Sequence, residues 1–177
     1  MINIIKDGLW KQFGASIDTL KNAIEMWPEE YWNTDRKFFY IVFHTMIFLD
    51  YYLTIPPDNF SSGLPFKIAA RGEELKEAVD DVTPERVYSK KEMLDYLEAC
   101  REKCHKLIGG LSEEKIKQVW IEKPDELSPP DILHYTTLEI LLYNMRHVQH
   151  HSAQLNMILR KKINNSPDWV SHAEDGL

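Results

Sequence analysis

Cysteine is scarce in this chain: among 177 residues only Cys100 and Cys104 occur, one helical turn apart. A disulfide within one regular helical turn would have strained geometry, so a disulfide framework is excluded as the source of stability. We interpret both residues as buried or half-buried structural thiols. The neighbouring pair Cys104-His105 leaves a second metal site as the alternative interpretation.

Long apolar runs are missing as well. No stretch approaches the roughly 20 uninterrupted apolar residues of a membrane-spanning helix, and even the apolar segment 38–53 contains His44 and Asp50. Residues 1–7 have no apolar core followed by a small-residue cleavage site, as a signal peptide would. We therefore expect no membrane association and a cytoplasmic location.

Positive charge is in the minority, with 21 Lys and Arg against 28 Asp and Glu and a net charge of −7. This balance, with no basic stripe, argues against nucleic acid as a partner. The glycine-rich phosphate loops, GxSxG and HExxH are all absent. The paired Glu-x-x-His motifs of di-iron bundles are absent too, which argues against a dinuclear carboxylate site.

The length of the chain suits one domain with a sizeable core, residues 1–177. Apolar residues recur at three- and four-residue steps in four long segments, and no segment convincingly predicts a sheet. The sequence therefore predicts an all-α protein, and a four-helix bundle as its architecture. The predicted helices cover residues 4–26, about 34–54, 89–107 and 137–162, and the third begins with a capping box formed by Ser89 and Glu92.

A long connection, about residues 55–87, separates the second and third predicted helices. Pro56-Pro57, Pro65 and Pro84 interrupt it, and residues 69–79 could form one short helix. Connections of this length in compact domains are often functional. The segment could cover a site, or it could be a surface excursion without a role.

Three of the seven histidines lie within five residues of the last predicted helix: His147, His150 and His151. His147 and His151 are one turn apart, so both imidazoles can point to one spot. Val148 belongs to the apolar face; His151 lies roughly 60° from it, whereas His150 lies about 160° away. We expect His147 and His151 to face the interior and His150 to face solvent.

His44 lies in the middle of the apolar face of the second predicted helix, where its ring nitrogens need partners. In a bundle it could join His147 and His151 in a three-histidine site with one open position, which suits zinc, nickel or iron(II). The alternative is a satisfied core histidine and two unrelated residues on a helix face. Tyr143, one turn before His147, could lie beside the site or contact substrate.

The pattern His147-x-x-x-His151-x-x-Gln154, together with His44 in Phe43-His44-Thr-Met-Ile-Phe48-Leu49-Asp50, resembles the DinB/YfiT-like superfamily. The order of elements is similar along nearly the whole chain. The resemblance implies a four-helix bundle that holds a divalent metal through His44, His147 and His151. Many members have Arg-Gly before the glutamine, where this chain has Ser152-Ala153.

Some members of that superfamily are thiol S-transferases and others resemble hydrolases. The resemblance implies a metal-dependent enzyme that transfers a low-molecular-weight thiol to an electrophile, with a small molecule as its substrate. Metal-dependent hydrolysis and a non-catalytic metal-binding role are the alternatives. Gln154 would lie a turn beyond His151, next to the ligands. The resemblance, together with abundant apolar helical surface, also predicts a homodimer.

Overall fold

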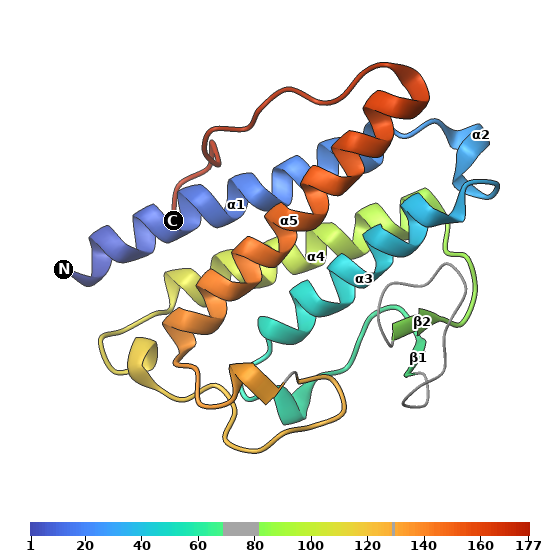
Figure 1. Ribbon diagram of the computed structural model, residues 1–177. Helices are drawn as coiled ribbons and strands as arrows, with labels where there is room; N and C mark the ends of the chain where they lie inside the picture. The colour runs from blue at the N-terminus through green and yellow to red at the C-terminus, as the bar shows by residue number, and fades with distance from the viewer. Residues whose placement is uncertain (69–81, 129) are drawn as a thin grey trace.

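The computed structural model describes residues 1–68, 82–128 and 130–177, and this part of the chain is mostly helical (Figure 1). The expectation of an all-α protein is thereby confirmed in its coarse form. The α-helices are α1 (Ile2–Met26), α2 (Glu29–Trp32), α3 (Arg36–Tyr52), α4 (Lys90–Gly109) and α5 (Thr137–Ile163). Three short 3-10 turns, Pro57–Asn59, Lys115–Lys117 and Pro130–Ile132, lie in the connections.

The four long helices lie side by side and share one apolar core. α1 packs against α4 and α5, and α3 packs against the same two helices (Figure 1). Each helix turns an apolar stripe toward its neighbours, so the core forms where the stripes meet. The largest side chains in this core are fully buried, among them Trp10, Trp27, Trp32, Phe13 and Phe38.

Helix α3 is buried on almost all sides. Fourteen of its 17 residues are buried, including His44 and Asp50. A helix surrounded in this way can present a side chain in several directions without exposing it to water. No helix in the described ranges is both long and apolar enough to cross a membrane.

Helix α5 has well-defined ends. The Thr136 hydroxyl accepts from the backbone N–H of Glu139, and the Glu139 carboxylate accepts from the Thr136 N–H at 2.8 Å, which is a capping box. Asn164 ends the helix in the left-handed conformation, with φ 54°. The predicted capping box at Ser89 is also present at the start of α4.

The connection between α3 and α4 contains a small sheet that the sequence pattern did not predict. Strands β1 (Phe66–Ile68) and β2 (Val82–Pro84) pair antiparallel, with Lys67 opposite Thr83. Strand β2 contacts α3, and the Tyr88 ring stacks on Phe43, the residue before His44, at 5.8 Å. The short helix expected at residues 69–79 lies outside the described residues.

Residues 164–177 run back along α1 after α5 ends (Figure 1). The Ala173 N–H donates to the Lys11 carbonyl at 2.9 Å. The Arg101 guanidinium of α4 donates to Asp18 on α1 and to Asp175 in the tail, at 2.7 Å to each carboxylate. The tail is therefore bonded to two helices from distant parts of the chain.

Candidate metal centre

His44 is brought to the centre by α3, one turn before Phe48. The His44 side chain is only 3% exposed. The centroids of the His44 and Phe48 rings lie 4.8 Å apart. Phe48 also packs edge-on against His147, at 5.8 Å between centroids. One aromatic ring thus fills the space beside both imidazoles, which limits the directions in which they can turn.

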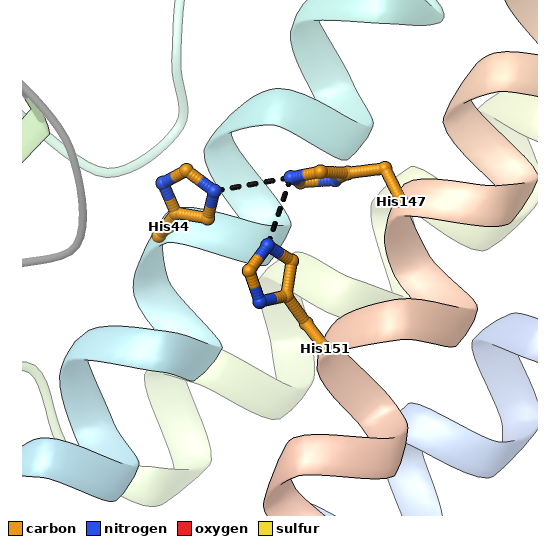
Figure 2. Close-up of side chains that lie close together, drawn as sticks. All are labelled: His44, His147 and His151. Atoms are coloured by element: carbon orange, nitrogen blue, oxygen red, sulfur yellow. Dashed lines mark hydrogen bonds between the residues drawn. The ribbon is translucent and has the colours of Figure 1, made fainter.

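Helix α5 supplies the other two imidazoles. His151 is buried and His147 is half-buried, whereas His150 is exposed. This is the orientation that the position of Val148 on the apolar face predicts. Figure 2 shows His147 and His151 reaching from consecutive turns of α5 toward His44 on α3.

The three imidazoles converge through their Nε2 atoms. The Nε2 atom of His147 lies 3.0 Å from that of His44 and 3.1 Å from that of His151 (Figure 2). One ligand atom from each residue lies within 4.8 Å of the other two. Two nitrogens bound tetrahedrally to one zinc ion at about 2.0–2.1 Å would be roughly 3.3 Å apart. The observed separations are close to that value.

The Nε2 atom of His147 has an imidazole nitrogen of His44 on one side and of His151 on the other. An imidazole nitrogen carries either one hydrogen or one lone pair in the ring plane. The Nε2 atom of His147 therefore cannot make a good bond to both His44 and His151 at once. A cation between the three nitrogens would let each of them present a lone pair, so the arrangement fits a metal better than it fits an internal network.

Burial keeps His147 neutral. It lowers the pKa of His147 to about 2, with further lowering from the neighbouring His151, His44 and His150. The neutral imidazole is the form that binds metal, and protonation competes with binding. At neutral pH the His147 ring therefore needs to lose no proton before it can act as a ligand.

Gln154 fixes the orientation of His151. Its side-chain carbonyl lies 2.9 Å from Nδ1 of His151, so the Nδ1–H donates to it and Nε2 keeps the lone pair that faces the cluster. The Gln154 amide nitrogen lies 3.2 Å from Nε2 of His150. The exposed His150 therefore contacts Gln154, and its ring also meets that of His151 edge-on at 5.1 Å between centroids.

Tyr143 lies near the three histidines, with Tyr52 packed between its ring and that of His147. Its ring meets that of Tyr52 edge-on at 5.3 Å, and Tyr52 lies 6.2 Å from the His147 ring. Burial, followed by the interaction with Tyr143, raises the pKa of Tyr52, and burial raises that of Tyr143. Sequence reasoning missed Tyr52, which lies two turns after His44 on the same helix.

Two pockets reach the histidines of α5, one at His151 and the other at His147. One lies between α3 and α5 and is lined by His151 and Gln154. The other is lined by Tyr143, His147 and His150. The second pocket is lined by residues of α5 alone, and the first by residues of α3 and α5 together with Tyr31, Thr34 and Asp35. Neither lining includes residues 55–87, so a covering role for that segment stays a prediction.

No carboxylate joins the cluster within the part of the chain that the structure describes. The buried Asp50 belongs to a separate network, in which it accepts from Tyr96 and Lys103 at 2.6 Å each. The two cysteines are free and buried, as predicted, and burial raises the pKa of both thiols. The described residues thus form one cluster that could hold a metal ion, made of imidazoles alone.

The structure brings together the three histidines that the sequence singled out, and their role as metal ligands stays a prediction. Gln154 contacts one of the three directly. Tyr143 packs on Tyr52, which in turn packs on His147, and it lines a pocket together with His147. Comparisons with protein-family models, curated proteins and solved structures find no match to this chain.

Proposed function

We propose that this protein binds one divalent metal ion through His44, His147 and His151 and uses it to activate a low-molecular-weight thiol for transfer to an electrophile. The observation that carries the proposal is the convergence of the three Nε2 atoms, at 3.0 and 3.1 Å. Three neutral imidazoles suit zinc, nickel or iron(II) and leave one coordination position for an outside ligand.

The charge of the ligand set supports a thiolate in that position. Neutral imidazoles leave the metal with a net charge near +2, which favours an anionic fourth ligand and lowers the pKa of a bound thiol. The thiol releases its proton to solvent, and the sulfur lone pair then forms a bond to an electrophilic carbon. The leaving group departs with the electron pair of the bond that breaks, so the step needs no external oxidant.

Hydrolysis by metal-bound hydroxide is the competing function. It usually relies on a carboxylate that accepts a proton from the attacking water. The absence of such a group from the cluster, among the residues described, favours the thiolate route. A metal-binding protein without catalysis is the remaining alternative.

We further propose that the chain is a four-helix bundle of the DinB/YfiT-like type and that it forms a homodimer. The packing of α1 and α3 against both α4 and α5 supports the bundle. Leu142 and Met157, exposed by 41% and 56%, supply apolar surface on α5 that supports the dimer. Sedimentation that gives a strict monomer at micromolar concentration would contradict it.

The test is an assay of protein loaded with zinc or nickel, with 2-mercaptoethanol and 1-chloro-2,4-dinitrobenzene as generic substrates. We expect thioether formation that disappears with chelator and in His147→Ala but persists in His150→Ala. Metal bound at one equivalent without any thioether or ester hydrolysis would point to the non-catalytic alternative. Ester hydrolysis alone would point to the hydrolase.

A further inference from the structure

A pocket of about 910 Å³ opens beside His151, between the first half of α3 and the second half of α5. Its size is that of a small-molecule site. Ile41 of α3 and Met157 and Ile158 of α5 line it with apolar surface. Because His151 lines the same pocket, a molecule bound there can reach the cluster of histidines.

The pocket carries positive charge in a protein whose net charge is −7. Four basic residues line it, Arg36, Lys37, Lys161 and Lys162, against a single acidic residue, Asp35. Lys162 is paired with Asp35 at 3.3 Å. The other three basic side chains are exposed and make no ion pair with any residue of the described ranges.

The basic residues at the start of α3 lie where they do not stabilise the helix. Arg36 and Lys37 occupy its first turn, which contains no acidic residue. Positive charge at a helix N-terminus opposes the helix dipole, and acidic residues are favoured there. Helix stability therefore does not account for these two residues, whereas binding of an anion would.

Helix geometry sets the distance between the charge and the histidines. Lys37 lies seven positions before His44, about 10 Å along the helix axis, and Lys161 lies ten positions after His151, about 15 Å. Long, flexible side chains can shorten both distances. A carboxylate held by them would lie on the order of 8 Å from an atom bound at the histidines.

We propose that this pocket, which we call the α3–α5 pocket, binds the carboxylate end of an elongated small-molecule substrate whose reactive end lies at the three histidines. Lys37, Lys161 and Arg36 pair with the carboxylate, and Ile41 and Ile158 contact an apolar middle section. The inference rests on the proposed function, since it assigns the substrate class of the same centre.

The first test uses cobalt-loaded protein and two thiols of equal length, 6-mercaptohexanoate and 6-mercaptohexanol. Binding is followed by the near-ultraviolet thiolate-to-cobalt absorption band. We expect the acid to reach half-saturation at a concentration at least about tenfold lower, because a charge-assisted pair is among the strong hydrogen bonds. In Lys161→Gln, and likewise in Lys37→Gln, we expect the ratio of the half-saturation concentrations of the alcohol and the acid to fall severalfold.

Arg160→Gln is the matched control, since Arg160 is the neighbouring exposed residue on α5 and does not line the pocket. It changes the net charge by the same amount and is expected to keep the advantage of the acid. Equal half-saturation for the two thiols in the wild type would overturn the α3–α5 pocket as a carboxylate site and leave the metal-thiolate function standing.

The second test needs neither metal nor thiol. Chelator-treated protein labelled with ¹⁵N is titrated with hexanoate and with hexanol, and amide shifts are followed by NMR. We expect hexanoate to shift the amides of Ile158 and Lys161 more than hexanol does, with weaker binding in Lys161→Gln. Binding of hexanoate without any cobalt-thiolate band would refute the thiol function but support the pocket; no shift with hexanoate would refute the pocket.

Discussion

The Nε2 atoms of His44 and His147 lie 3.0 Å apart although 103 positions of sequence separate the two residues. One is held by the most buried helix and the other by the face of α5 that packs on it. The contact therefore depends on how α3 and α5 are packed, and a metal ion between the two would act as a cross-link between these helices.

Removal of any one of the three imidazoles should empty the centre. We expect His44→Ala, His147→Ala and His151→Ala each to lose most bound metal, because two protein donors are too few for a zinc site. His150→Ala should keep nearly full stoichiometry, since His150 is exposed and contributes no nitrogen to the cluster of ligand atoms. The measurement is the metal content of each variant after dialysis at neutral pH. If His150→Ala lost its metal while His151→Ala kept it, His150 rather than His151 would be the ligand.

Gln154→Ala should lower the affinity for the metal without abolishing binding. Loss of the 2.9 Å bond to His151 Nδ1 frees the ring to turn, and the loss of such supporting bonds usually costs about 10–100-fold in metal affinity. Competition with a chromophoric chelator gives the dissociation constant. Gln149→Ala, on the same helix, is the control, and equal affinities for the two variants would remove Gln154 from any role at the centre.

Metal should stabilise the folded protein through mass action. At a free metal concentration 100 times the dissociation constant the gain is about 2.7 kcal/mol, or roughly 5–11 °C in Tm for a chain of this size. Thermal unfolding with zinc and with chelator measures it. The increase should vanish in His44→Ala; a similar increase in that variant would mean that the ion binds elsewhere.

The capping box at the start of α5 should be needed for the stability of the helix that holds two ligands. Thr136→Ala removes the hydroxyl that accepts from the Glu139 N–H, and we expect a loss of about 1 kcal/mol in the free energy of unfolding. Urea unfolding of metal-free protein measures the change. Thr34→Ala, at an exposed hydroxyl before α3, is the comparison; a loss no larger for Thr136 than for Thr34 would refute the prediction.

The Glu92 carboxylate should make the protein sensitive to acid. Hydrogen bonds from Arg86 and from Ser89 lower the pKa of Glu92 to about 2 from an ordinary 4.5. Because the folded pKa is the lower one, the stabilisation is present above pH 4.5 and is lost as the pH falls toward 2. Glu92→Gln should flatten the decline in unfolding free energy across this window, whereas Glu113→Gln, at an exposed position, should leave it unchanged.

Long periodic segments explain why much of this fold could be predicted. The apolar steps of α1, α3, α4 and α5 extend over many turns, and the phase of α5 was enough to turn His151 inward and His150 outward. The strands β1 and β2 contain three residues each, too few for an alternating pattern to appear. Strand β2 also contacts α3, and a contact between such distant parts of the chain forms only in the folded protein.

The candidate site was predictable in its ligands but less so in their surroundings. His44, His147 and His151 could be chosen because a histidine on an apolar face requires a partner. Tyr52 could not be chosen in the same way, since a tyrosine in an apolar helix is ordinarily part of the core. The contact of Gln154 with both His151 and His150 depends on side-chain rotamers, which helical spacing does not determine.

The tail that returns along α1 has a consequence for synthesis of the chain. Helix α1 is synthesised before α5, on which it packs, and before residues 173 and 175, to which it is bonded. Until then its apolar stripe has only α4 as a partner among the long helices it contacts in the finished protein. The nascent chain therefore exposes part of the apolar stripe of α1 until α5 has been synthesised, which makes α1 a natural binding segment for chaperones acting at the ribosome.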